Sequence, residues 1–358
     1  MKPDRNLSTK MKILITGGCG FIGRNAATRF LGLGHRVTVL DNLSRPGSEQ
    51  NLVDLQTING FTFERADLRD REVVSEIVRR GRFDVLIHLG GQVAVTTSML
   101  DPRYDFDVNA TGSLNVLEAV RSHSPETIVL NASTNKVYGE LVDLGKEEDA
   151  TRYRLPNLAS GVSEAQPLDF HSPYGCSKGA ADQYMIDYAR CFGLRTVSLR
   201  QSCIYGYWQF GVEDQGWVAW FIIAHHLNRP ITIYGTGKQV RDVLFIDDLL
   251  DCYVAVIERI DQVSGMAFNI GGGPENTLSL LEFMQLLEQV SGRKVQHSYS
   301  GWRPGDQPVF ISDVTQARAL LGWSPKVGTR EGIGRLYRWV SDNSLFFERR
   351  LTAGSVAK

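Results

Sequence analysis

The sequence has few cysteines, almost no net charge and no long apolar run, and each scarcity excludes a class of protein. Its five cysteines are an odd number spread along 358 residues without a C-x-x-C pair, so they predict neither a disulfide framework nor a zinc site. A formal net charge of −1 gives no basis for binding nucleic acid or an anionic membrane. No run approaches the roughly 20 apolar residues that span a bilayer, and the polar first ten residues do not resemble a signal peptide. These features predict reduced thiols in a soluble, cytoplasmic protein without a metal site.

Short apolar segments alternate with helical patterns through the first 200 residues. The segments are rich in Val, Ile, Leu and Thr and show little polar alternation, which is typical of strands buried on both faces. They are Lys12–Thr16, Arg36–Asp41, Thr62–Asp67, Asp84–Leu89, Thr127–Ser133 and Arg195–Arg200. Amphipathic stretches such as Arg71–Arg80 and Thr111–Ser122 lie between them. This alternation predicts an α/β fold with a Rossmann-type, doubly wound parallel sheet.

The pattern loosens after Arg200, where we expect a smaller mixed α/β lobe. Strands are predicted at Pro230–Tyr234 and Ala267–Ile270, and helices after Asp247, at Leu278–Val290 and at Glu331–Ser341. Ser279 and Glu282 form a plausible capping box for the second of these helices.

A glycine-rich turn follows the first strand. Gly17, Gly20 and Gly23 have the spacing G-x-x-G-x-x-G and open a helix, so the backbone can approach a pyrophosphate at the helix N-terminus. Asp41 ends the second strand, where an acid accepts the adenosine ribose hydroxyls. A carboxylate there repels a 2′-phosphate, which favours NAD over NADP, although Arg24 and Arg45 lie nearby in the sequence.

A Tyr-x-x-x-Lys pair at Tyr174 and Lys178 follows a Ser-Pro helix start. The spacing puts both side chains on one helix face. An adjacent ammonium favours the phenolate, so Tyr174 can remove and return a hydroxyl proton. Thr134, at the end of the fifth strand, is expected to hydrogen-bond the reacting oxygen. The three predicted catalytic residues are therefore Thr134, Tyr174 and Lys178.

Together these motifs resemble the extended short-chain dehydrogenases/reductases that act on nucleotide sugars, over roughly residues 11–340. Within that family the chain is most similar to the CDP-tyvelose (CDP-paratose) 2-epimerase branch. The resemblance rests on residues 88–98, 133–139, 168–184, 214–217 and 237–244. It implies an isomerase with bound NAD that oxidises the sugar C2 hydroxyl, lets the keto sugar turn over, and returns the hydride to the other face.

The resemblance also implies binding residues and a domain division. Cofactor-binding positions are Gly17, Gly20, Phe21, Ile22, Gly23, Asp41, Asn42, Ser44, Asp67, Leu68, Leu89, Gly91, Gln92, Asn109, Tyr174 and Lys178. Substrate-binding positions are Thr96, Ser98, Asn135, His171, Ser202, Gln209, Gln215, Arg241, Arg303 and Asp306. Residues 11–200 form the NAD-binding domain, with 240–275 returning to it; 201–239 and 276–345 form the nucleotide-sugar lobe; 1–10 and 346–358 are tails. A homodimer or homotetramer is expected, with the helices at Thr111–Ser122 and Pro173–Phe192 as the first interface candidates.

Alternatives remain open at this point. A 4-epimerase uses the same triad. A 4,6-dehydratase requires an Asp-Glu pair where Asn135 and Lys136 stand, and a non-catalytic dinucleotide sensor has no use for Tyr174 and Lys178. Trp208 replaces an arginine of the 2-epimerase pattern, in a segment expected near the sugar. The stretch 145–166 is an irregular loop that is a candidate lid.

Overall fold

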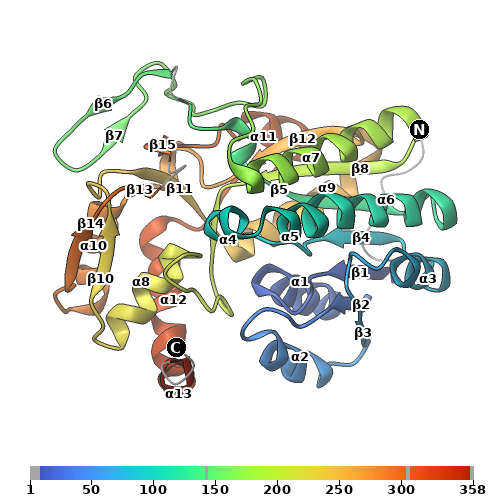
Figure 1. Cartoon of the computed structure of the whole chain (residues 1–358), viewed down its shortest axis with the longest axis horizontal. Helices are drawn as coiled ribbons and strands as arrows, with labels where there is room; N and C mark the ends of the chain where they lie inside the picture. The colour runs from blue at the N-terminus through green and yellow to red at the C-terminus, as the bar shows by residue number, and fades with distance from the viewer. Residues whose placement is uncertain (1–8, 142–143, 304–306, 355–358) are drawn as a thin grey trace.

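A seven-stranded parallel sheet forms the larger lobe of the computed structural model, which describes residues 9–141, 144–303 and 307–354 (Figure 1). The strand order is β12-β8-β5-β4-β1-β2-β3. The strands are β1 (Lys12–Thr16), β2 (Arg36–Asp41), β3 (Phe61–Arg65), β4 (Val85–His88), β5 (Ile128–Thr134), β8 (Arg195–Gln201) and β12 (Met266–Ile270). The Rossmann-type fold predicted from the sequence is confirmed. The third strand ends two residues earlier than expected, so Asp67 lies in the loop beyond it.

Helices cover both faces of this sheet. One face packs against α1 (Phe21–Gly32) and α9 (Ile246–Val263), and the other against α3 (Arg71–Gly81), α6 (Gly112–His123) and α7 (Ser172–Phe192). Successive side chains of a strand point to opposite faces. Ile13 and Ile15 of β1 therefore belong to the first core, while Leu14 belongs to the second. This two-sided burial is the reason for the continuous apolar runs in the sequence.

A chain of short helices connects β4 to α6. It consists of α4 (Val95–Leu100), α5 (Pro102–Phe106) and the π-helical turn η1 (Asp107–Thr111), which runs directly into α6. Helices α4 and α5 both pack against α7. This arrangement brings the loop after β4 next to the helix that carries Tyr174 and Lys178.

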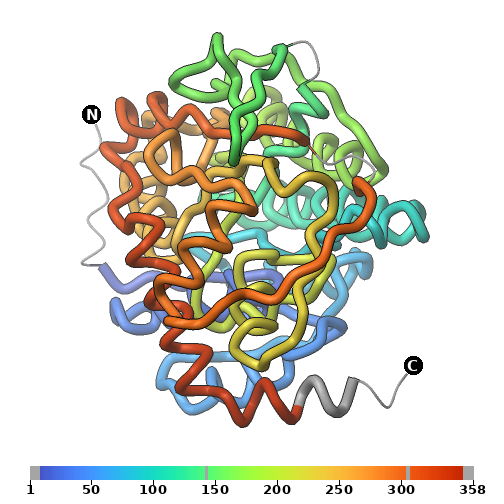
Figure 2. The backbone as a smooth tube through the Cα atoms, turned by 90° about the vertical axis from the view of Figure 1, so that its left-hand side faces the viewer, coloured from blue at the N-terminus to red at the C-terminus, as the bar shows by residue number. Residues whose placement is uncertain are grey.

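The smaller lobe, at the left of Figure 1, is built around two small sheets. Strands β9 (Cys203–Tyr205), β13 (Thr277–Ser279) and β15 (Val309–Phe310) all pair with β11 (Val240–Phe245), and β10 (Ile231–Tyr234) pairs with β14 (His297–Ser300). The helices of this lobe include α8 (Trp217–His226), α10 (Leu280–Ser291) and α12 (Thr329–Asp342). Figure 2 views the molecule from this side, with the yellow, orange and red segments in front.

The predicted capping box is confirmed. Ser279 Oγ accepts a hydrogen bond from the Glu282 amide (3.0 Å), and the Glu282 carboxylate accepts one from the Ser279 amide (2.9 Å). The helix begins at Leu280 rather than Leu278 because Ser279 is its N-cap.

Residues 240–275 divide between the two lobes. Helix α9 and strand β12 pack on the large sheet, whereas β11 pairs with the strands of the small one. The segment predicted wholly in the first domain therefore contributes a strand to the second lobe, and the domain boundaries themselves stay a prediction.

The stretch 145–166 contains a small hairpin, β6 (Glu147–Glu148) and β7 (Tyr153–Arg154), at the upper left of Figure 1. Arg152 forms an ion pair with Glu282, and the Tyr153 amide donates a hydrogen bond to the Lys238 carbonyl (2.9 Å). The hairpin is thus anchored on the smaller lobe.

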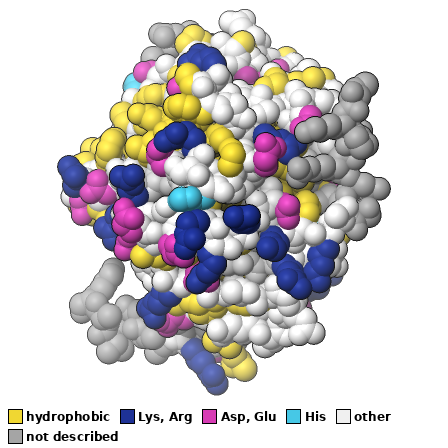
Figure 3. Space-filling model, turned by 90° about the vertical axis from the view of Figure 1, so that its right-hand side faces the viewer, with side chains coloured by type: hydrophobic (Ala, Val, Ile, Leu, Met, Phe, Trp, Pro, Cys, Tyr) yellow, Lys and Arg dark blue, Asp and Glu magenta, His cyan; other side chains and the backbone are white. Residues whose placement is uncertain are grey.

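The surface on the opposite side carries charges of both signs, with Lys and Arg lying among Asp and Glu (Figure 3). Arg79–Glu76 on α3 and Arg121–Glu118 on α6 are ion pairs at the protein surface. Over the described part of the chain, no helix combines the length and apolarity that a membrane span needs.

Candidate active site

The glycine-rich turn fits a dinucleotide diphosphate. Gly17 has φ +65°, and a Cβ there would lie 2.7 Å from the Gly90 backbone; a Cβ on Gly23 would lie 2.4 Å from the Gly17 carbonyl oxygen. These two glycines are required by close backbone packing. At Gly20 the nearest atom to such a Cβ is 3.2 Å away, so its missing side chain instead leaves the helix end open. Gly20 is the N-cap of α1 and has no side chain with which to cap the helix. The backbone amides of the first turn, including those of Phe21 and Ile22, are therefore available to bind an anion.

Asp41 lies at the carboxyl end of β2, beside this turn. Its carboxylate accepts hydrogen bonds from the amides of Cys19 (2.9 Å) and Leu43 (2.8 Å), and burial raises its pKa. The two basic residues that could have favoured NADP each contact another side chain. The Arg24 guanidinium lies 3.7 Å over the Trp208 ring, and Arg45 donates a hydrogen bond to Gln215. A carboxylate acceptor at this position suits the ribose hydroxyls of NAD better than the 2′-phosphate of NADP.

Four predicted cofactor-binding positions lie together in the loops after β2 and β3: Asn42, Ser44, Asp67 and Leu68. Asn42 donates a hydrogen bond to Asp67 (2.9 Å) and accepts one from the Ser44 amide (3.0 Å). Two hydrogen bonds from the Arg69 side chain, each 2.9 Å, hold the pKa of Asp67 well below its usual range. Leu68 is buried next to them and contacts the β4 end through Gly90.

The loop after β4 places the remaining cofactor positions. Leu89 continues the β1–β4 pairing through a hydrogen bond to the Thr16 carbonyl. Asn109, on η1, accepts from the Gln92 amide (2.9 Å) and donates to the Gln92 carbonyl (3.0 Å). A Cβ on Gly91 would lie 2.8 Å from Asn109 Oδ1, so glycine is needed for this contact.

The predicted catalytic residues meet at the junction of β5 and α7. Tyr174 and Lys178 are each 8% exposed and Thr134 is 7% exposed. Burial raises the pKa of Tyr174 to about 12, and a hydrogen bond with Thr134 opposes this rise. Burial lowers the pKa of Lys178 to about 8. The Lys178 ammonium donates a 2.6 Å hydrogen bond to the Ala132 carbonyl oxygen, which fixes its place beside β5.

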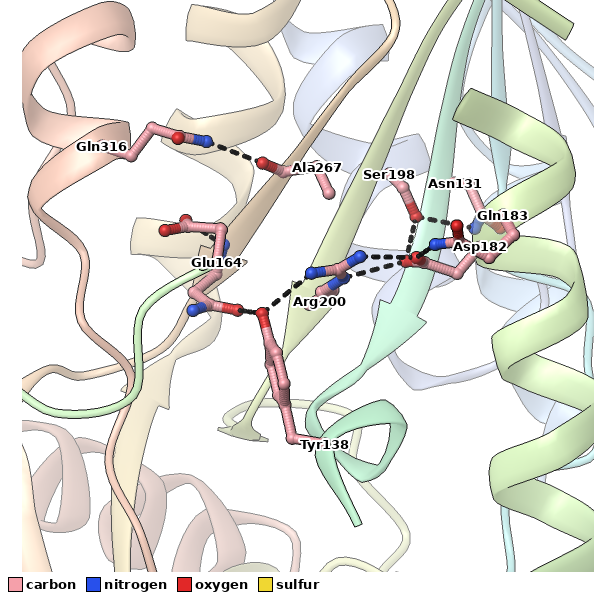
Figure 4. A network of polar contacts seen from close by, with 10 residues as sticks. Asn131, Tyr138, Glu164, Asp182, Gln183, Ser198, Arg200, Ala267 and Gln316 are labelled. Carbon is pink, nitrogen blue, oxygen red and sulfur yellow. Dashed lines mark hydrogen bonds and ion pairs between the residues drawn. The ribbon is translucent and has the colours of Figure 1, made fainter. Parts of the chain in front are cut away.

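A buried polar network fixes α7 against the sheet (Figure 4). Arg200 of β8 forms an ion pair with Asp182 (2.9 Å), one turn beyond Lys178, and donates to Tyr138 Oη (2.9 Å). Tyr138 in turn donates to Asn269 of β12 (2.8 Å). Because Tyr138 follows closely on Thr134, the network joins both catalytic segments to the same part of the sheet.

Three predicted substrate positions lie in the smaller lobe or in contact with it. Arg241 is 9% exposed on β11, and its guanidinium hydrogen-bonds the Val240 carbonyl. Arg303 stacks 3.9 Å over the Tyr234 ring and pairs with Asp214 (3.2 Å). Asn135 is buried next to Thr134 and donates to Gln307 Oε1 (3.3 Å). Asp306 lies outside the described residues.

Other predicted substrate positions have partners within the protein. Ser98 bonds the Val95 carbonyl of its own helix, and Ser202 bonds the buried Asp242. His171 lies at the surface, 2.9 Å from Asp169. Gln209 donates a hydrogen bond to the Ile204 carbonyl, and Gln215 accepts one from Arg45. Thr96 is exposed on α4.

Trp208 packs against helices α1 and α12. Its ring packs on Arg24 of α1 and lies 5.4 Å from the Trp339 ring of α12. The tryptophan thus contacts the arginine that follows the glycine turn, and its expected place near the sugar stays a prediction.

Sequence reasoning missed three residues of the site. Asp105 is wholly buried beside α7, Tyr234 stacks with Arg303, and Gln307 bonds both Asn135 and the Gly139 carbonyl. For Asp105 a signal existed, because it stands four residues before Asn109 and so lies one helical turn from it. The other two come from the smaller lobe, whose contacts with β5 no local pattern reveals.

Comparison with known proteins decides the family. The model of the NAD dependent epimerase/dehydratase family matches residues 13–271. The chain belongs to this family. It is 46% identical to the CDP-paratose 2-epimerase of Salmonella typhi over 92% of this chain and 99% of that protein. It is 30% identical to the UDP-glucose 4-epimerase of Mycolicibacterium smegmatis over 93% of this chain and all of that one.

Solved structures of family members have the same fold. The Thermotoga maritima UDP-glucose 4-epimerase with UDP-glucose superposes with a TM-score of 0.81 at 28% identity, covering 93% of this chain and 99% of that one. The Thermus thermophilus enzyme in complex with NAD gives 0.78 at 30% identity, covering 92% and 99%. An NAD-dependent epimerase of the extended short-chain dehydrogenase/reductase type is thereby established, as the sequence predicted.

Proposed function

We propose that the protein inverts C2 of a nucleotide-linked hexose, converting CDP-paratose to CDP-tyvelose or acting on a closely related sugar. The observation that carries the proposal is the 46% identity to a CDP-paratose 2-epimerase along nearly the full length of both chains. The buried grouping of Thr134, Tyr174 and Lys178 supplies the chemistry that such an inversion needs.

In the proposed reaction Tyr174 is the base and acid. Its phenolate takes the proton of the C2 hydroxyl and later returns it, while the Thr134 hydroxyl hydrogen-bonds the same oxygen. Lys178 favours the phenolate through its charge. Bound NAD, held by the glycine turn and Asp41, would supply the hydride acceptor and donor for C2 and a positive charge that favours the phenolate. The sugar undergoes no net oxidation, so the cofactor is regenerated in each turnover. Tight retention of the cofactor therefore suits this reaction.

The nucleotide is proposed to bind in the smaller lobe. Guanidinium groups pair phosphate oxygens bidentately, and this lobe carries Arg241 on β11 and Arg303 stacked on Tyr234. The Tyr234 ring under Arg303 offers a face on which a base can stack. Asp306 is kept as a ribose ligand on the basis of the sequence motif alone.

Two alternatives are weaker. A 4,6-dehydratase lacks its Asp-Glu pair, since Asn135 and Lys136 occupy those positions. Burying Lys178 is unfavourable because its ammonium loses contact with water. A protein that only sensed a dinucleotide would have no use for Tyr174 and Lys178 at such a buried site. A 4-epimerase shares the triad and is separated by its product.

We also propose a homodimer or homotetramer and a cytoplasmic location. Tyr184 and Phe192 are large exposed side chains on α7, one of the two predicted interface helices. Sedimentation velocity of the purified protein tests the assembly.

The test of function compares substrates. Purified protein is incubated with CDP-paratose and, in parallel, with CDP-, GDP- and UDP-glucose, and the sugar protons are followed by NMR, with Tyr174→Phe as the inactive control. Inversion of CDP-paratose at C2 supports the proposal. Inversion of another nucleotide hexose at C2 would support the proposed reaction but identify a different substrate. Inversion at C4 would overturn the proposal.

A further inference from the structure

Asp105 is a buried carboxylate beside the catalytic helix that the reaction described above does not use. It lies on α5 with no exposed surface. Its Oδ1 accepts hydrogen bonds from Gln92 Nε2 (2.7 Å) and Asn109 Nδ2 (3.2 Å), and its Oδ2 accepts one from Ser177 Oγ. Burial raises the pKa of Asp105, and the hydrogen bonds from Ser177 and Gln92 oppose this rise by stabilising the ionised carboxylate.

These three partners connect the two halves of the active site. Gln92, in the loop after β4, and Asn109, on η1, are predicted cofactor-binding positions, and Ser177 lies between Tyr174 and Lys178 on α7. Asn109 also donates to Ser177 Oγ (3.1 Å). One carboxylate thus fixes the orientation of the catalytic helix relative to the cofactor loop.

Within the described part of the chain Asp105 has no ion-pair partner in direct contact, and Lys178 acts on it only through its nearby charge. Asp182, the other buried carboxylate near Lys178, forms an ion pair with Arg200, and that pair has no net charge (Figure 4). None of the ion pairs found among the described residues includes Asp105, and Lys178 bonds the Ala132 carbonyl instead. In a poorly solvated site an unbalanced charge acts strongly on its neighbours.

We propose that Asp105 is a positioning residue of the reaction, which fixes α7 through Ser177 and supplies the negative charge that keeps Lys178 in its ammonium form. The proposal rests on the proposed function of Tyr174 and Lys178. The other charged groups around this pair are Asp182 on α7, Arg45 from the loop after β2, and His88 on β4. Burial lowers the pKa of His88 to about 3, so it is neutral.

The sign of the effect distinguishes this role from a purely structural one. A negative charge raises the pKa of both groups: it favours the Lys178 ammonium and disfavours the Tyr174 phenolate. Activity requires phenolate and ammonium together. Removing the charge is therefore expected to move both limbs of the pH profile of kcat to lower pH.

The test is the Asp105→Asn holoenzyme, which is nearly isosteric. Both half-maximal pH values are expected to fall by about one pH unit, with NAD content and Tm close to wild type. The control Asp107→Asn removes a charge two residues away, in the ion pair with Arg103, and is expected to leave both limbs in place. A lower kcat with unshifted limbs in Asp105→Asn overturns the proposal.

A second readout does not depend on the substrate. The tyrosinate absorbance of Tyr174, obtained by subtracting the spectrum of Tyr174→Phe, is expected to reach its midpoint at lower pH in Asp105→Asn. An unchanged midpoint also overturns the proposal. If no nucleotide sugar is turned over, the proposed function fails while this titration still tests Asp105. If Asp105→Asn does not fold, Asp105→Ser gives the same comparison with a smaller neutral side chain.

Discussion

The ammonium of Lys178 donates a 2.6 Å hydrogen bond to the carbonyl oxygen of Ala132, two residues before Thr134 on β5. The lysine of the catalytic helix is therefore fixed by the strand that carries the catalytic threonine. Because the site is buried, this ammonium loses its proton far more readily than an exposed lysine, with a pKa of about 8.

Lys178→Arg tests the consequence for pH. With the positive charge of bound NAD bringing the pKa of Tyr174 below that of Lys178, loss of the lysine proton ends activity, so kcat of the wild type is expected to decline as the pH rises through about 8. A guanidinium keeps its proton throughout this range. The variant is expected to have a lower kcat but no decline between pH 8 and 10. A decline at the same pH in both proteins would assign the limb to another group.

Gly23→Ala tests the glycine turn. A Cβ at this position lies 2.4 Å from the Gly17 carbonyl oxygen and 2.5 Å from Gly18 Cα, so the turn must open. We expect a loss of about 1–3 kcal/mol in the free energy of unfolding and release of NAD during gel filtration. Gly32→Ala is the control on the same helix, because nothing lies within 4 Å of its Cβ. Equal NAD content in the two variants would contradict the account of the turn.

Trp208→Ala tests the place of the tryptophan. The ring covers the Arg24 guanidinium at 3.7 Å, and such a contact contributes about 1–2 kcal/mol when desolvated. We expect a drop in stability of this size and weaker NAD retention. The ratio of kcat/KM between two nucleotide sugars is expected to stay constant. A changed ratio would return Trp208 to the sugar site.

Arg303→Ala tests the nucleotide end of the cleft. Loss of a charged hydrogen bond to a diphosphate is expected to raise KM roughly tenfold to a hundredfold, with kcat nearly unchanged because Arg303 is remote from the reacting carbon. Arg330→Ala, an exposed arginine on α12, is the control. A fall in kcat at constant KM would contradict this assignment.

Much of the larger lobe could be predicted because its sequence signals are local. The bounds of β1 and β2 agree with the structure, since a two-sided sheet imposes uninterrupted apolar runs on each strand. The turn glycines and the Tyr174–Lys178 pair carry their spacing in the sequence itself.

The smaller lobe and the inner part of the site could not be predicted in the same way. Strands β9 and β15 are three and two residues long, and they exist because β11 pairs with both. The partners of Ser202 and Gln215, namely Asp242 and Arg45, lie 40 and 170 residues away in the sequence. No local pattern shows which of two loops a polar side chain will reach.

In the proposed reaction one hydrogen leaves C2 and returns to C2 within a single active site. The most direct test is turnover of CDP-paratose that carries deuterium at C2, in ordinary water, with the product examined by NMR. The expected product is CDP-tyvelose with the deuterium still at C2. Inverted product in which a solvent hydrogen has replaced the deuterium would contradict it.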